Sequence, residues 1–267
     1  MATLRGGRMA RGPELSARAV ALVAVFAALY VALSLLPGLP TPGDPTGSIK
    51  IEIEASLAPL YGLILGPYLG ALAAFIGTVL AWLLPPSSAS IFGVPALACP
   101  AVDALVVGLM VKKRWKAAFS LLAIFIVAYW LSPICLPITA YWYVGLAGSF
   151  DKLIALALVP PVALMLERSS AWREPSEGDG ISGLTVRTGL LFALSFIGNE
   201  ADSALGCAAY AFFLTAFYPL DAIRFYYTMA PLIYFLVRVI QALIATAVGV
   251  PLLRALKRAR LEVAWAV

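Results

Sequence analysis

Histidine is absent from this chain of 267 residues, and charged residues make up only 12% of it. Without histidine there is no imidazole to ligate zinc or haem, or to relay protons. The cysteines are few and share no CxxC or other metal-ligand spacing, and we interpret them as small packing residues of apolar stretches: Cys99, Cys135 and Cys207. We therefore expect no metal and no cofactor.

Common motifs of nucleotide hydrolysis and hydrolytic catalysis are missing as well. The chain has no GxxxxGK[ST] phosphate-binding loop, no HExxH pair and no GxSxG nucleophile turn. These absences exclude ATP hydrolysis through such a loop and the corresponding protease and esterase chemistry. They favour a protein that binds and moves a solute over an enzyme that cleaves one.

Apolar residues dominate what remains, at 62% of the chain, and the mean hydropathy is +0.94. A soluble domain carries about 25% charged residues, and no soluble fold could bury this much apolar surface. We predict an all-α, polytopic transmembrane bundle, a single domain over 1–267 in the cell membrane. Its apolar runs predict about eight membrane segments, at 17–36, 55–65, 68–84, 91–111, 117–136, 150–166, 184–218 and 229–253.

Basic residues gather at alternate ends of these segments. One side receives the N-terminal arginines, the basic residues of 112–116 and 168–187, and the C-terminal tail. The other side receives only Lys50, Lys152 and Arg224. Because lysine and arginine are enriched on the cytoplasmic side, both termini are predicted to be cytoplasmic, with a flexible cytoplasmic loop at 168–184.

The clearest candidate site is a group of polar residues in the middle of the apolar run 184–218. A carboxylate at the bilayer centre costs about 2.5–3.5 kcal/mol, so Glu200 and Asp202 should face a protein interior. We predict that both bind substrate together with Asn199. Since Glu200 and Asp202 would point in different directions on one helix, we expect the helix to break at Gly198. Alternatively, the acids are satisfied by packing or by an ion pair.

Two further charges lie within predicted segments. Because a buried cation needs a partner, we expect Arg238 to pair with Asp103 or with Glu200. Alternatively, Asp103 and Arg238 contact the solute directly. In the first outer loop, Glu52 and Glu54 are candidates for a gate over the site, although acids in loops are commonly just solvated.

Alanines recur at four-residue spacing on the first predicted helix, at Ala17, Ala21, Ala24 and Ala28. Small residues at this spacing let helices approach closely. The stripe predicts either packing within the chain or a surface for a partner subunit.

Three stretches together resemble the substrate-binding membrane subunit, or S component, of energy-coupling factor (ECF) transporters. They are the alanine-striped helix of 17–31, the run LAPLYGLILGPYLGA at 57–71, and the last apolar run, 230–253, with its basic tail. The resemblance implies a tight outer binding pocket for a vitamin or similar micronutrient. It also implies a transmembrane coupling subunit and two ATPase subunits as partners, with the alanine stripe facing the coupling subunit and the loop 38–54 covering the pocket.

Two other functions remain open on the sequence alone. A self-sufficient secondary transporter would carry an inverted internal repeat, which is not evident here. An intramembrane enzyme would use Asp103 and Asp202 as acid and base, which requires the two side chains to come within hydrogen-bond reach, directly or through water. The leading prediction is a vitamin-binding subunit of an uptake transporter, which is not itself an enzyme.

Overall fold

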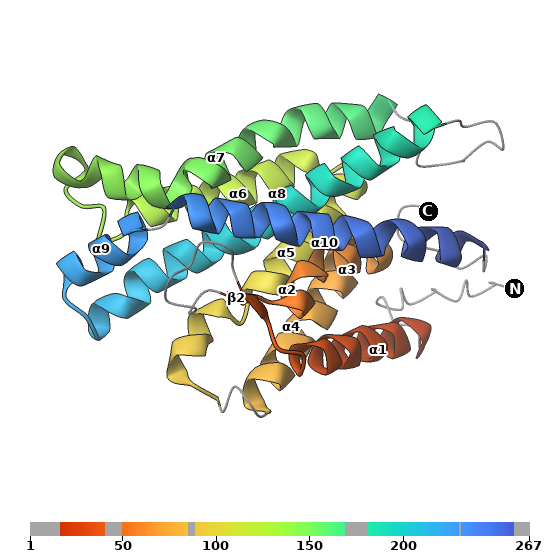
Figure 1. Cartoon of the computed structure of the whole chain (residues 1–267), viewed down its shortest axis with the longest axis horizontal. Helices are drawn as coiled ribbons and strands as arrows, with labels where there is room; N and C mark the ends of the chain where they lie inside the picture. The colour runs from red at the N-terminus through yellow and green to blue at the C-terminus, as the bar shows by residue number, and fades with distance from the viewer. Residues whose placement is uncertain (1–16, 41–49, 85–88, 169–180, 230, 259–267) are drawn as a thin grey trace, which may run out of the picture.

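The computed structural model describes residues 17–40, 50–84, 89–168, 181–229 and 231–258 (Figure 1). These residues are mostly helical, which confirms that the fold is built of helices, as predicted. The exception is a two-residue antiparallel pair of strands, β1 (Leu39–Pro40) and β2 (Lys50–Ile51). The proposed loop over the site, 38–54, lies partly outside the described residues, at 41–49.

The helices follow the apolar runs closely at most positions. They are α1 (Ala17–Ser34), α2 (Ile53–Ser56), α3 (Ala58–Leu65), α4 (Pro67–Leu83), the 3-10 helix η1 (Ile91–Ala96), α5 (Cys99–Val111), α6 (Trp115–Trp130), α7 (Ile138–Arg168), α8 (Ile181–Phe213), the 3-10 helix η3 (Leu214–Ala216), α9 (Leu220–Met229) and α10 (Pro231–Arg258).

Four stretches of the described chain are long and apolar enough to cross a membrane: Ala17–Ser34, Ile91–Val111, Ile138–Arg168 and Pro231–Leu256. Three shorter apolar segments accompany them, at Ile53–Leu65, Pro67–Leu83 and Trp115–Trp130. The chain is therefore built of membrane-type helices.

A Gly-Pro turn separates α3 from α4. Gly66 has φ 82°, a conformation that side-chain-bearing residues rarely adopt, and it ends α3. Pro67 then opens α4, where its missing N–H is no loss. The turn folds α4 back onto α3, and both helices pack on α5.

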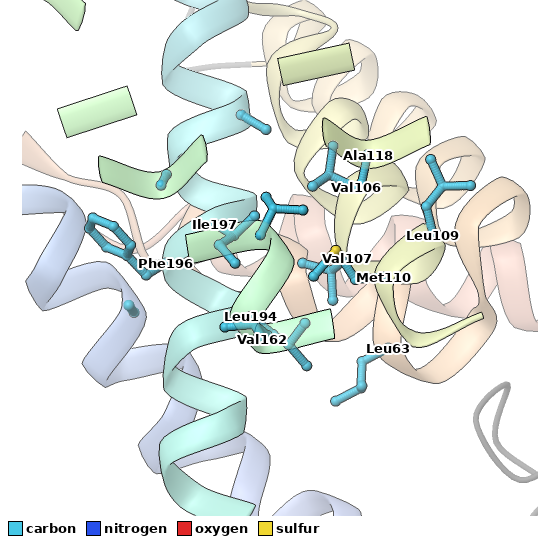
Figure 2. Packing of buried hydrophobic residues seen from close by; sticks show 14 of the residues in the cluster. Leu63, Val106, Val107, Leu109, Met110, Ala118, Val162, Leu194, Phe196 and Ile197 are labelled. Atoms are coloured by element: carbon cyan, nitrogen blue, oxygen red, sulfur yellow. The ribbon is translucent and has the colours of Figure 1, made fainter. Parts of the chain in front are cut away.

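The core lies where α5 and α8 cross. Val107 and Met110 of α5 face Leu194 and Ile197 of α8, as Figure 2 shows, and all four side chains are buried. Helices α3, α6, α7 and α10 pack around this crossing. The fold thereby places the middle of α8, with its acids, among the side chains of its neighbours.

Helix α8 runs unbroken through Gly198 and Asn199, so the predicted break is wrong. Its 33 residues span about 50 Å, more than the ~30 Å hydrocarbon core. Gly198 is needed for close packing against α5 and not for a turn.

Two features at the end of the bundle where α7 begins were not predicted. Helix α7 begins at Ile138, twelve residues before the expected segment, and α9 forms an extra short helix. Arg224 of α9 holds this region together by donating hydrogen bonds to the carbonyls of Ile134 and Leu136, at 2.9 and 3.2 Å. Its guanidinium also lies 3.4 Å from the ring centre of Tyr141.

The start of α1, the end of α7, the start of α8 and the end of α10 lie at one end of the bundle, at the right in Figure 1. Basic residues mark these helix ends, among them Arg18, Arg168, Arg187 and Arg254. The segment 169–180, which contains most of the predicted cytoplasmic loop, lies outside the described residues. We call the end with these basic residues the basic end. We call the other end, where α9 lies with Phe225, Tyr226 and Tyr227, the aromatic end.

Candidate functional site

Charged and amide side chains from α5, α7, α8 and α10 are buried within the apolar bundle. They are Asp103, Asp151, Lys152, Asn199, Glu200, Asp202 and Gln241, and the partly exposed Arg238 lies with them. Most lie nearer the aromatic end than the basic end. Helices α5 and α10 begin at the aromatic end, and their polar residues lie in the first half of each helix. Helix α8 ends there, and its polar residues lie in its second half. The structure thus brings Asn199, Glu200, Asp202, Asp103 and Arg238, the predicted site residues, into one interior region.

Glu200 lies beside α7, where it joins a group that we call the α7–α8 triad: Asp151, Lys152 and Glu200. The ammonium of Lys152 donates to both carboxylate oxygens of Asp151 at 2.9 Å. It lies 3.8 Å from a Glu200 oxygen, too far for a hydrogen bond. Lys152 is only 3% exposed, so its predicted position at the outer boundary is wrong.

Asp202 faces the opposite neighbour, α10. A terminal nitrogen of Arg238 lies 3.9 Å from Asp202 Oδ2 and donates to Gln241 Oε1 at 2.8 Å. This ion pair differs from both expected pairs, Arg238 with Asp103 and Arg238 with Glu200. The reason is helical geometry, because residues two apart point about 200° apart, so that Glu200 faces α7 when Asp202 faces α10.

The Asp202–Arg238 pair is loose and partly accessible. The two side chains keep 10% and 17% of their surface exposed, whereas Glu200 and Asp103 keep none. The Nε atom of Arg238 is buried and has no hydrogen-bond partner in the described structure. A guanidinium has five N–H donors, so Arg238 can still bind acceptors of a ligand.

Asn199 is fully buried and donates from Nδ2 to the carbonyl of Ser195 at 2.8 Å, one turn back on α8. Its side-chain oxygen has no hydrogen-bond partner among the described residues. The side-chain amide therefore donates to a carbonyl of its own helix, and its Oδ1 atom remains able to accept a hydrogen bond.

Asp103 packs against the backbone of α8 at Gly198. A Cβ at Gly198 would overlap the Asp103 carboxylate, and it would lie 2.7 Å from Val107 Cγ2. Only glycine lets the two helices approach this closely. No direct hydrogen bond joins Asp103 to Asp202 in the described structure.

We expect Gly198→Ala to lower the free energy of unfolding by about 2 kcal/mol, because the added methyl group forces Asp103 and Val107 to move. Unfolding in detergent, followed by tryptophan fluorescence, measures the change. Gly189→Ala on the same helix is the matched control, since a Cβ there meets nothing within 4 Å. Equal stability of the two variants would contradict the close packing of α5 on α8.

The predicted gating acids lie beside α10. Helix α2 begins after Glu52 and packs against both α1 and α10. The Glu52 carbonyl accepts from the Ser56 hydroxyl at 2.6 Å, which ties the loop to α2. Glu52 is exposed on one side. The protein around the rest of its side chain removes water from the carboxylate, and the negative charges of Glu54 and Asp202 add to this effect. Together they raise the pKa of Glu52 to about 7. Glu54 lies within α2 and is partly exposed.

Sequence reasoning missed the α7 members of the triad. Asp151 and Lys152 are adjacent opposite charges inside an apolar stretch, which is a usable signal for a buried pair. The predicted segment began at residue 150, which placed both charges at its end. A crevice beside Lys152 is lined by Ile126, Tyr129, Gly148, Ser149, Ala204 and Cys207, and it leaves about 0 Å³ for even a water-sized molecule. Pockets for drug-sized ligands hold roughly 300–1,000 Å³, so this crevice is too small for a vitamin.

Ionisable side chains inside a bundle of apolar helices are rare, and they commonly mark the solute or ion pathways of membrane proteins. A family model described as "ECF-type riboflavin transporter, S component" matches residues 14–160, more than half of the chain. The chain belongs to this family, which confirms the resemblance seen in the sequence. No significant match was found among curated proteins or among solved structures.

The matched residues run from the start of α1 into α7 and stop short of α8 and α10. The family is one of transporter subunits, not enzymes, and its members work with a membrane coupling subunit and ATPases. The Asp202–Arg238 pair lies beyond the matched range, so its role has to be argued from its geometry.

Proposed function

We propose that this chain binds riboflavin from outside the cell and serves as the substrate-binding subunit of an ECF-type uptake transporter in the plasma membrane. The family description supports the choice of vitamin. The observation that carries the proposal is the Asp202–Arg238 pair, whose atoms are 3.9 Å apart and whose side chains remain partly exposed inside an apolar bundle. A loose, accessible pair of this kind has hydrogen-bonding capacity left for a ligand.

The chemistry of the pair matches the polar edge of a flavin. The isoalloxazine ring of riboflavin presents two carbonyl oxygens on either side of an N–H group, and its ribityl chain carries hydroxyl groups. Arg238 can donate to the carbonyl oxygens, and Asp202 can accept from the N–H or a hydroxyl. We infer that these two side chains contact the vitamin, with Asn199, Glu200 and Asp103 in the layer behind them.

Aromatic side chains gather about two helical turns further toward the aromatic end of α8. Tyr210 donates to the carbonyl of Phe92 in η1 at 2.8 Å, and the Phe92 ring lies 6.2 Å from that of Phe213. Flat rings of this kind stack favourably on an aromatic ligand. They support a binding site that opens at the aromatic end, next to Glu52 and Glu54 as gating residues.

We infer a topology of about eight membrane segments with both termini in the cytoplasm. The basic end supports this orientation, because cytoplasmic ends are enriched in lysine and arginine. The alanine stripe at Ala17, Ala21, Ala24 and Ala28 lies on the exposed face of α1, away from the buried residues that pack on α4. Its place on the outside of the bundle supports a contact with the coupling subunit, as the family implies.

Purification after growth with riboflavin tests the proposed ligand. We expect the folded protein to carry about one flavin per chain, seen by its visible absorbance and identified by mass spectrometry. Protein freed of flavin should quench riboflavin fluorescence when the vitamin is added back. A monodisperse, folded protein that neither retains flavin nor quenches its fluorescence would rule riboflavin out.

A further inference from the structure

The described interior of the bundle contains more acidic than basic side chains. The buried acids are Asp103, Asp151, Glu200 and Asp202, and the basic side chains among them are Lys152 and Arg238. The buried Arg224 is not one of this group, because it pairs with Asp221 on α9 at 2.9 Å. If all six were ionised, the interior would hold two uncompensated negative charges. An unpaired charge in an apolar medium is expensive, so this excess needs a physical explanation.

Both cations already have partners. Lys152 is bound by the two oxygens of Asp151 at 2.9 Å, which neutralises it. Arg238 pairs with Asp202 and donates to Gln241. Glu200 only shares the Lys152 ammonium, 3.8 Å away, with Asp151. The two carboxyl groups left over are therefore Asp103 and Glu200, and both are fully buried.

Neither of these carboxyl groups receives a hydrogen bond in the described structure, at any of its four oxygens. An ionised carboxylate can only accept hydrogen bonds, whereas a protonated one also carries its own donor. The charged neighbours of Asp103 are Asp202 and Arg238. Those of Glu200 are Lys152, Asp151, Arg238 and Asp202, with the thiol of Cys207 near the same charges. Within each set of neighbours the number of acidic side chains equals the number of basic ones. No cation of either set therefore remains to neutralise Asp103 or Glu200.

The packing around these groups leaves little room for a hydrated or coordinated cation. Asp103 lies directly against the backbone of α8 at Gly198. No group of three metal-ligating side chains was found among the described residues. A proton, by contrast, requires no coordination shell. We propose that Asp103 and Glu200 each bind a proton in the folded protein, so that the interior of the bundle is a two-proton site with no net charge.

Isosteric amides test this site. Asp103→Asn and Glu200→Gln resemble the protonated side chains, and we expect each to change the thermal midpoint in detergent by less than about 3 °C. Asp151→Asn and Asp202→Asn are the matched controls, because they remove an ionised partner from Lys152 or Arg238. Breaking a buried pair should lower the midpoint by at least about 6 °C. Losses at Asp103 and Glu200 as large as those of the controls would overturn the proposal.

Infrared spectroscopy gives a second readout, which needs only the native fold and one double variant. At mildly alkaline pH the wild-type protein should show the C=O stretching band of protonated carboxyl groups, and Asp103→Asn/Glu200→Gln should lose it. The folded state then binds two protons that the unfolded chain releases. Stability of the wild-type protein should therefore fall as pH rises, more steeply than that of the double variant. A wild-type protein without the band, or equal pH slopes, would refute the two-proton site.

Discussion

Replacing Gly62 by alanine should destabilise the fold severely, because it inserts a methyl group between two backbones in contact. A Cβ at this position would overlap the backbone carbonyl of Ala104 in α5, and it would lie 2.8 Å from its carbonyl carbon and 2.9 Å from the amide nitrogen of Gly108. A side chain can rotate away from an overlap, but the backbone of a packed helix cannot. We expect Gly62→Ala to lower the free energy of unfolding by about 3 kcal/mol or more, at the upper end for overpacked cores.

The measurement is the fraction of monodisperse protein that survives heating in detergent, together with chemical unfolding where enough protein folds. Gly206→Ala provides the control, because its added Cβ meets only the Cys99 sulfur at 3.5 Å, an ordinary contact. The effect should also resist rescue, since no single side chain causes the overlap. A Gly62→Ala protein as stable as Gly206→Ala would show that α3 and α5 are not in direct backbone contact.

The same contact shows why the family motif has its glycines. In the run LAPLYGLILGPYLGA, Gly62 touches α5, Gly66 turns the chain with its positive φ, and Gly70 lies against the carbonyl of Tyr61. The sequence predicted close helix packing from the spacing of small residues. It did not indicate which helix would fill each gap, because spacing describes only one side of a contact.

Composition and hydropathy were sufficient to predict a helical membrane bundle, since apolar runs of membrane length have few other solutions. They failed at Gly198, where the sequence predicted a break and the structure has a continuous helix. Glycine weakens a helix only slightly, and here the packing of Asp103 and Val107 against it holds the helix in place. The packing of α5 against α8 therefore outweighs the low helix propensity of glycine.

The partners of the buried charges were the least predictable part of the site. The periodicity of α8 separates Glu200 from Asp202, and this was predicted for a continuous helix. Which neighbour each acid meets depends on how α7 and α10 pack around α8, and a single sequence does not encode that arrangement locally. Lys152 was missed for a related reason, because the helix that carries it extends beyond its apolar run at the aromatic end.

Replacing Arg238 by methionine should weaken riboflavin binding about tenfold to a hundredfold. Methionine keeps much of the apolar stem but removes every N–H donor, and a hydrogen bond from a charged group is worth about 1.5–3 kcal/mol. The affinity is measured by quenching of flavin fluorescence, and the stability of the ligand-free variant is measured separately. Arg254→Met is the matched control, because Arg254 is exposed at the basic end of the same helix.

The two effects of Arg238→Met can be separated. Loss of the ion pair leaves Asp202 without its partner and lowers stability whether or not a ligand binds. Arg238→Met/Asp202→Asn removes that unpaired charge, so it should recover stability while its affinity for riboflavin stays low. If the double variant recovers affinity as well, Arg238 only supports the fold, and the vitamin must bind elsewhere. If affinity remains low in a stable protein, the flavin requires the charged pair itself, with the donors of Arg238 and the carboxylate of Asp202.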